Sequence, residues 1–311
     1  MSHQEINVTT SKQYNHALGS IYRLYEDEYH EKFVNPDTFS SNSEKIMNCL
    51  MKKYKKATII NFISAILWHT TNIESRHDPL FIDNIRKIYR EYGKTIKEEI
   101  ERENIGKEFD LTEKEQKSFM FWEDILHIYE KMSQELDDTN YSQMIDYVIV
   151  SLYVLHPPVR ADYANMKLFI DENQIPPQYD DNYCVIQPRP RFVFQKYKNV
   201  KHRGKTVILM EPELHAILLR WIADLNPSEW LLPTRFAHTF KAMSENALVK
   251  RIPEIFVKHG GKPVTVNTLR HSFVSFLSKH DQEYNRKLAN ADKMMHSVDM
   301  ATKYRRMVYL Q

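Results

Sequence analysis

The chain has 311 residues, which suggests two domains, each long enough to bury its own core. With 42% hydrophobic and 27% charged residues, its composition is that of an ordinary globular protein. The net charge of +2 hides an asymmetry, because residues 1–190 carry 22 basic and 31 acidic side chains (−9) and residues 191–311 carry 21 and 10 (+11). Such an asymmetry points to a region that binds a polyanion.

Glycine and cysteine usage exclude further classes of protein. The 6 glycines cannot form either of the common glycine-rich phosphate-binding motifs, so a glycine-cradled nucleotide is not expected. Cys49 and Cys184 form neither a disulfide framework nor a cysteine-based zinc site, which favours a reducing compartment. The N-terminus is no signal peptide, and the apolar run 147–155 is too short to span a bilayer. We expect an intracellular protein with no metal, no other cofactor and no membrane partner.

Residues 1–110 are mostly helical in pattern and form the first predicted domain. Apolar residues within 42–69 recur at close to helical spacing, and a basic run falls at the join of two expected helices. A further helix with a charged outer face is predicted over 81–101, and Gly106 marks a break after it. The basic run consists of Lys52, Lys53, Lys55 and Lys56.

Residues 111–311 form the second predicted domain, where the pattern changes. Thr112 and Glu115 fit a capping box that starts a helix over 113–136, and the next helix, 141–156, is apolar nearly all round and therefore buried. Short β-like runs follow at 184–187, 191–198 and 205–210, with a basic hairpin tip at 199–204. Helices return at 212–224, 241–259, 266–279, 284–295 and after Ser297. The predicted fold class is mainly α with a small antiparallel β-sheet, which makes this domain α+β.

Five sequence features with polar or charged residues follow one another in the second domain, and their order is informative about function. Arg160 directly follows the buried helix, and a lysine (Lys198 or Lys196) lies on the first strand of the hairpin. The run Leu269-Arg270-His271-Ser272-Phe273 comes next, followed by Met294-Met295-His296-Ser297. The last feature is Tyr304, eight residues after His296.

This ordered set resembles the tyrosine recombinases (phage-type integrases) and, in mechanism, the type IB topoisomerases. The family order is an arginine, a hairpin lysine, H-x-x-R-H-[ST]-F, L-G-H-[ST] and a nucleophilic tyrosine. The resemblance covers roughly residues 112–311 and implies a catalytic domain there. The helical residues 1–110 look like the family's core-binding domain. It also implies that the two domains form a C-shaped clamp around duplex DNA.

The resemblance implies a role for each residue of the set. Arg160 and Arg270 would hold the non-bridging phosphate oxygens bidentately, which lysine cannot do. Tyr304 would attack phosphorus and leave a 3′-phosphotyrosine, and Lys198 would protonate the leaving 5′-oxygen. Lys196, Lys201 and Lys205 are alternatives for this general acid. His296 would donate a hydrogen bond to the phosphate, and His271 would assist near Arg270.

The resemblance therefore implies a site-specific DNA recombinase or integrase that acts on double-stranded DNA as a multimer. Alternatives are a topoisomerase-like enzyme that relaxes DNA, and a catalytically impaired DNA-binding relative. A viral or mobile-element origin is expected, with action in the host nucleus or cytoplasm, where its DNA is. Candidate phosphate contacts, for which solvated surface lysines are the plainer interpretation, are Lys52, Lys53, Lys55, Lys56, Lys201 and Arg203.

Several positions depart from the family pattern or have a plainer interpretation. Asn267 replaces the histidine that opens the second box; it can donate a hydrogen bond but cannot titrate near neutral pH. Met295 replaces the glycine of the last box, and Tyr163 replaces the acidic residue after the first arginine, with Asp162 beside it as a substitute. Arg160 alternatively caps the preceding helix, His271 is alternatively a core histidine, and Tyr309 is the rival of Tyr304.

Overall fold

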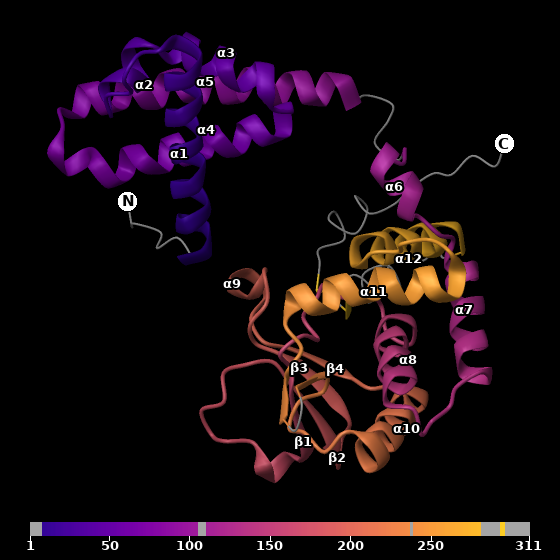
Figure 1. Ribbon diagram of the computed structural model, residues 1–311. Helices are drawn as coiled ribbons and strands as arrows, with labels where there is room; N and C mark the ends of the chain where they lie inside the picture. Colours follow the sequence, from indigo (N-terminus) through magenta and orange to yellow (C-terminus); the bar gives the residue numbers. More distant parts are fainter. Residues whose placement is uncertain (1–7, 105–109, 237–238, 281–292, 296–311) are drawn as a thin grey trace. The chain divides into compact units, whose positions relative to one another are not determined.

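The computed structural model describes residues 8–104, 110–236, 239–280 and 293–295 (Figure 1). The chain divides into two compact units, Met1–Lys107 and Glu108–Gln311. The functions predicted for the corresponding domains, DNA binding for the first and catalysis for the second, stay predictions. The helix expected after Ser297 and nearly all of the helix expected over 284–295 lie outside the described residues.

The described part of the first unit is helical. Its helices are α1 (Val8–Tyr29), α2 (Asp37–Ser41), α3 (Ser43–Lys53), α4 (Lys56–Ile73) and α5 (Pro79–Asn104), with a 3-10 turn at Glu74–Arg76. Helices α4 and α5 lie side by side, and α1 crosses α4 (Figure 1). Aromatic and aliphatic side chains from all five helices or their connections form one buried core, which includes Tyr25, Phe33, Phe39, Leu50, Phe62 and Tyr89.

The predicted join between two helices at the basic run is confirmed. Helix α3 ends at Lys53, and Tyr54 and Lys55 adopt extended backbone conformations before α4 begins at Lys56. The ring of Tyr54 packs on that of Phe62, with 4.8 Å between centroids, so the break is held by aromatic contact. The lysines therefore stand at the two helix ends that flank a sharp bend.

The second unit opens with the predicted capping box, which is confirmed at α6 (Glu113–Ser118). The single helix expected over 113–136 is wrong, because the chain is extended at Phe119–Phe121 before α7 (Trp122–Gln134) begins. Phe119 and Met120 are buried there, and Lys262 donates to the Phe119 carbonyl oxygen at 3.2 Å. This tertiary capture of a helix-terminal carbonyl ends α6, and local periodicity does not reveal it.

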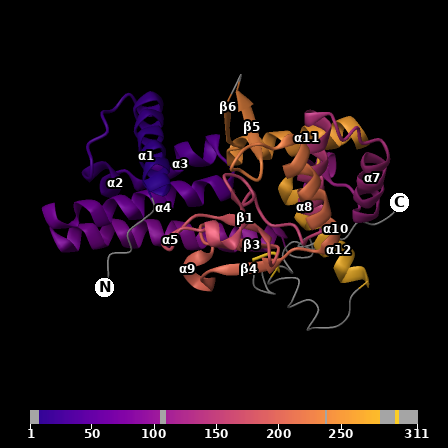
Figure 2. The same ribbon diagram turned by 90° about the horizontal axis from the view of Figure 1, so that it is seen from below.

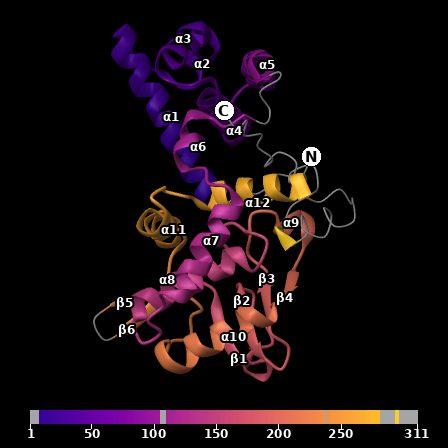
Figure 3. The same ribbon diagram turned by 90° about the vertical axis from the view of Figure 1, so that its right-hand side faces the viewer.

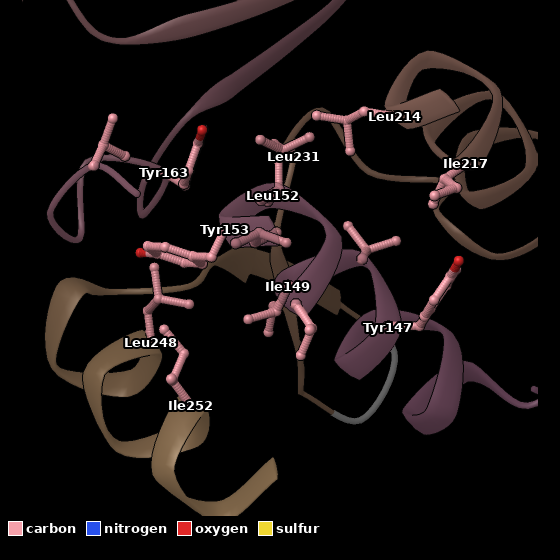
Figure 4. Close-up of a cluster of buried hydrophobic side chains, with 14 of the residues drawn as sticks. Tyr147, Ile149, Leu152, Tyr153, Tyr163, Leu214, Ile217, Leu231, Leu248 and Ile252 are labelled. Atoms are coloured by element: carbon pink, nitrogen blue, oxygen red, sulfur yellow. The ribbon is translucent and has the colours of Figure 1, made fainter. Parts of the chain in front are cut away.

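Helix α8 (Tyr141–Val154) is the centre of the second unit, as its apolar character predicts. Helix α7, the sheet and two later helices, α10 (Pro212–Arg220) and α11 (Glu245–Gly260), lie around it (Figures 1 and 3). In Figure 4, Ile149, Leu152 and Tyr153 of α8 stand among side chains from α10 and α11, which are Leu214, Ile217, Leu248 and Ile252. A π-helical turn at Trp221–Leu225 follows α10, and α12 (Val266–His280) is the last described helix.

The sheet is larger than predicted. Its four strands, in order β1-β2-β3-β4, are β1 (Lys167–Asp171), β2 (Tyr183–Gln187), β3 (Arg191–Phe194) and β4 (Thr206–Leu209). The predicted antiparallel pairing of β2, β3 and β4 is confirmed, but β1 was not predicted and runs parallel to β2. The hairpin between β3 and β4 is also shorter than expected, because β3 ends at Phe194 and a helical turn, α9 (Val200–Arg203), occupies its tip.

A second, two-stranded sheet precedes α11. Strands β5 (Pro233–Phe236) and β6 (Thr239–Ala242) pair in antiparallel fashion and stand apart from the larger sheet (Figure 2). The helix expected to start at residue 241 therefore begins at Glu245, after β6. Ser244 caps it by accepting a hydrogen bond from the Ala247 N–H, which gives this start a local cause.

Candidate active site

Arg160 lies in the segment that leaves the central helix. The hydroxyl of Tyr153, near the end of α8, donates to the carbonyl oxygen of Arg160 at 2.9 Å. The fully buried Tyr153 ring packs edge-on against Tyr163, 5.5 Å between centroids (Figure 4). The core therefore fixes the backbone of Arg160 on both sides, while its side chain stays partly exposed.

Arg270 lies on α12 and is completely buried. Its Nη1 donates to the carbonyl oxygen of Pro158 at 2.7 Å. Pro158 stands two residues before Arg160, so α12 and the segment after α8 meet at this hydrogen bond. Burial of a guanidinium is costly without a compensating anion, so such a position needs negative charge nearby.

The buried Asp162 carboxyl lies close enough to both arginines for their charges to act on it. Burial raises the pKa of its carboxyl to about 6, and the positive charges of Arg160 and Arg270 act in the opposite direction and lower it. Both predicted arginines are therefore within electrostatic range of one carboxyl group. Tyr163, which stands where the family has its acidic residue, instead lies in the core against Phe192 and Phe194. That Asp162 substitutes for the acidic residue stays a prediction.

We expect the stability of the Asp162→Asn protein, relative to that of wild type, to increase as the pH rises. The folded pKa of about 6 lies above the ordinary 3.8, so the native state holds a proton that the unfolded chain releases. Wild-type stability is therefore lost as the pH rises from 3.8 through 6, by about 3 kcal/mol in all. The Asp162→Asn protein has no titrating carboxyl at this position, so it does not lose this stability as the pH rises.

Urea unfolding of both proteins at about pH 4 and about pH 8 measures this effect as the change in their stability difference. A stability difference that is the same at both pH values would contradict a protonated Asp162 carboxyl in the native state.

The two hairpin lysines differ in surroundings, and the prediction that they lie on a strand is wrong. Both follow the end of β3, because Asn182 accepts hydrogen bonds from the backbone of Gln195 and Lys196 and draws the chain out of the ladder. The Nζ of Lys196 lies 3.1 Å from Asp181 and 3.4 Å from Asp180, and these contacts raise its pKa. Lys198 is exposed, in the turn before α9.

Two further residues of the second box lie on α12 beside Arg270. Asn267 is exposed in the first turn of the helix. His271 is 9% exposed, and its Nε2 lies 3.2 Å from Oε1 of Glu115. Glu115 was predicted only as part of the helix cap, so its approach to His271 is a contact that sequence reasoning missed.

The final box is described only at its start. Met294 and Met295 are buried, and Met295 has a φ of 56°, in the left-handed region that favours glycine. This position therefore has the backbone conformation for which the family's glycine is suited, although the side chain here is methionine. His296 and Tyr304, the predicted phosphate donor and nucleophile, lie outside the described residues, as does the rival Tyr309.

The predicted DNA-contacting lysines of the first unit fall into two pairs. Lys52 forms an ion pair with Glu28, and Lys56 forms ion pairs with Glu99 at 2.7 Å and Glu103 at 2.6 Å. In the described part of the chain, neither Lys53 nor Lys55 has an ion-pair partner, and both are exposed. In the second unit Lys201 is exposed and Arg203 partly buried on α9.

Metal ligands and membrane spans were searched for in the described residues. These residues include no group of three or more His, Cys, Asp and Glu side chains that could hold a metal ion. Within the same ranges, no helix combines the length and apolar character needed to cross a membrane.

Comparison with known proteins gives the fold. No protein-family model matches the sequence, and no curated protein matches it. A structure of the Tn1549 transposon integrase in complex with circular intermediate DNA matches with a TM-score of 0.51 at 12% identity, covering 99% of this chain and 92% of that chain. XerA recombinase (TM-score 0.42, 13% identity, 98% and 90% covered) and XerH site-specific recombinase bound to its difH substrate (0.39, 11%, 98% and 96%) also match. The chain therefore has the fold of the tyrosine recombinases, in a divergent sequence.

Proposed function

We propose that this chain is a tyrosine-type site-specific DNA recombinase or integrase. The observation that carries the proposal is the hydrogen bond from Arg270 Nη1 to the Pro158 carbonyl oxygen, which brings α12 to the segment that carries Arg160 two residues further on. Two guanidinium groups at one place can hold the non-bridging oxygens of a single phosphodiester. The tyrosine recombinase fold supports the same assignment.

The reaction moves one phosphodiester bond without net hydrolysis. The Tyr304 hydroxyl gives up its proton to solvent, and its oxygen forms a bond to phosphorus as the bond to the 5′-oxygen breaks. The departing oxygen takes a proton from Lys198. Attack by a 5′-hydroxyl of a partner strand then releases the tyrosine. Arg160, Arg270 and His296 stabilise the negative charge that develops on the phosphate. The bond energy is conserved in the phosphotyrosine, so no nucleotide cofactor is needed.

The proposal assigns a different role to each unit. The second unit holds the reacting phosphate, and the first unit binds the duplex as a core-binding domain. Recombination joins paired sites, and several protomers therefore assemble on DNA. Support for a DNA partner comes from the similar integrase structure solved in complex with circular intermediate DNA.

Trapping of a covalent adduct tests the proposal. Duplexes that the full chain binds would be selected from a random-sequence library and prepared with a nick placed at successive positions, so that a short cleaved fragment diffuses away. We expect wild-type protein to accumulate a protein–DNA adduct that survives denaturation. Absence of an adduct with every selected duplex would favour a DNA-binding protein without cleavage activity. An adduct accompanied by relaxation of supercoiled plasmid and no strand exchange would favour the topoisomerase-like alternative.

We expect Lys198→Ala to slow cleavage by about 10²–10⁴-fold and Lys196→Ala to have little effect. Lys196 is engaged by Asp180 and Asp181, which hold its proton, whereas Lys198 is exposed and has no ion-pair partner among the described residues. Single-turnover cleavage of a duplex with sulfur in place of the 5′ bridging oxygen is the check. A thiolate leaves without a proton, so this duplex should restore the rate of the Lys198 variant. Failure of the rescue would exclude Lys198 as the general acid.

Paired lysine variants test the first unit as the duplex-binding part. Lys53→Ala and Lys55→Ala are expected to weaken DNA binding and to lower the slope of log affinity against log salt by about 0.9 for each phosphate that is no longer neutralised. Lys52→Ala and Lys56→Ala should change it less, because their ammonium groups are already neutralised by Glu28, Glu99 and Glu103. Fluorescence anisotropy over a salt series measures both. If the Lys53→Ala and Lys55→Ala proteins keep the wild-type slope, the duplex does not contact these lysines.

A further inference from the structure

The capping box at the start of the second unit also reaches the catalytic box on α12. Glu115 Oε2 accepts hydrogen bonds from the backbone N–H of Thr112 at 3.0 Å and from its hydroxyl at 2.8 Å. The other oxygen, Oε1, lies 3.2 Å from Nε2 of His271. One carboxylate therefore joins the N-terminus of α6 to the residue that follows Arg270.

The surroundings hold this contact in place. The Glu115 side chain is 17% exposed and that of His271 is 11% exposed. The start of α7 packs on α12 as well, because the rings of Trp122 and Phe273 meet at 5.0 Å between centroids. A carboxylate with one oxygen bonded twice to the cap has little freedom to turn, so its second oxygen presents a fixed acceptor to the histidine ring.

We propose that Glu115 is a positioning residue for the reaction, acting through His271; this inference rests on the proposed function. An Nε2–H that donates to Oε1 sets the orientation of the imidazole ring. On α12, Arg270 is held by the Pro158 carbonyl and His271 by Glu115, so two different segments fix two consecutive residues of the box.

The chemistry of the cap separates this role from helix capping. A capping box accepts glutamine as readily as glutamate, because it needs one oxygen at the third helical position. An amide has one oxygen and no charge, so it cannot accept from the cap and from His271 together. Glu115→Gln thus keeps an oxygen for the helix cap and removes the charged oxygen that lies 3.2 Å from Nε2 of His271. Thr112→Ala leaves the carboxylate in place but removes the hydroxyl that donates to its Oε2, so only the backbone N–H of residue 112 still holds that oxygen.

Single-turnover cleavage of the selected nicked duplex at saturating protein tests the inference in the full chain. We expect Glu115→Gln to cleave at least about tenfold more slowly than wild type, because the histidine loses a charged hydrogen bond. Glu113→Gln, which removes an equal charge from the same helical turn, should cleave at the wild-type rate. Thr112→Ala keeps the carboxylate and one of the two bonds to its Oε2, so it should lower the melting temperature and slow cleavage less than Glu115→Gln does. Glu115→Asp, which keeps the charge, should cleave faster than Glu115→Gln.

A double-mutant cycle and a spectroscopic measurement complete the test. Glu115→Gln should slow a His271→Asn protein no further, and it should shift the ¹⁵N resonance of the His271 Nε2, whereas Glu113→Gln should not. Additive losses of rate, or equal rates for Glu115→Gln and Glu113→Gln, would overturn the inference. If wild type forms no adduct, the proposed function fails instead. The ¹⁵N shift, which needs no cleavage, then still decides whether Glu115 orients the ring.

Discussion

Tyr304→Phe is expected to abolish the covalent protein–DNA adduct, whereas Tyr309→Phe is expected to leave it intact. The phenol oxygen is the atom that bonds to phosphorus, and phenylalanine removes that atom alone. Tyr304 stands eight residues after His296, as the resemblance to the family requires, and Arg305-Arg306 follow it. Trapping on the selected nicked duplex, followed by protease digestion and mass spectrometry of the DNA-linked peptide, measures the attachment site.

The two variants control for each other, because each removes one hydroxyl from the same short segment. Tyr304→Phe should bind the duplex as tightly as wild type, so that loss of the adduct reports on chemistry and not on affinity. An adduct that persists in Tyr304→Phe and disappears in Tyr309→Phe would transfer the nucleophile to Tyr309. An adduct in both would mean that a different side chain attacks.

The elements that sequence predicts well are those with a local physical signal. The apolar run of α8 predicts its burial, and the Thr112 to Glu115 spacing predicts the start of α6. Gly204 at the tip of the hairpin and Gly261 at the end of α11 both have positive φ. Glycine at such positions is a strong sequence signal for a turn or a helix end.

The features that sequence misses depend on partners remote in the chain. Strand β1 pairs in parallel with β2 across an intervening segment, and α6 ends where Lys262 captures the Phe119 carbonyl oxygen. The same holds for the candidate site. The resemblance names Arg160 and Arg270 by their order, and Asp162 as the substitute acidic residue, but the burial of Asp162 and the contact of Glu115 with His271 exist only after folding.

Arg270→Lys and Arg160→Lys are each expected to slow cleavage by about 10²–10³-fold, the usual effect of removing one preorganised donor to a developing oxyanion. Lysine keeps the charge but presents a single point donor, so it cannot hold two phosphate oxygens as a planar guanidinium does. Single-turnover cleavage at saturating protein reports the rate, and urea unfolding of the same proteins reports stability.

The two variants should differ in stability. Arg270 is completely buried and its Nη1 is bonded to the Pro158 carbonyl oxygen, so lysine there should cost about 1–3 kcal/mol. The Arg160 side chain is partly exposed, and lysine should cost little. A rate that falls only where stability falls would mean that Arg270 is a structural residue and that Arg160 does not contact phosphate.

Arg251→Lys is the matched control for a half-buried arginine in the same unit. Its Nε donates to Oδ1 of the buried Asp146 at 2.7 Å, so lysine there should also destabilise the protein. The partner of Arg251 is Asp146 and not Asp162, and the cleavage rate of the folded variant should equal that of wild type. Loss of stability without loss of rate at Arg251, beside loss of rate without loss of stability at Arg160, would separate packing from catalysis. If Arg251→Lys slows cleavage as much as Arg160→Lys, the slow cleavage is not specific to Arg160, and the proposal that Arg160 holds the phosphate fails.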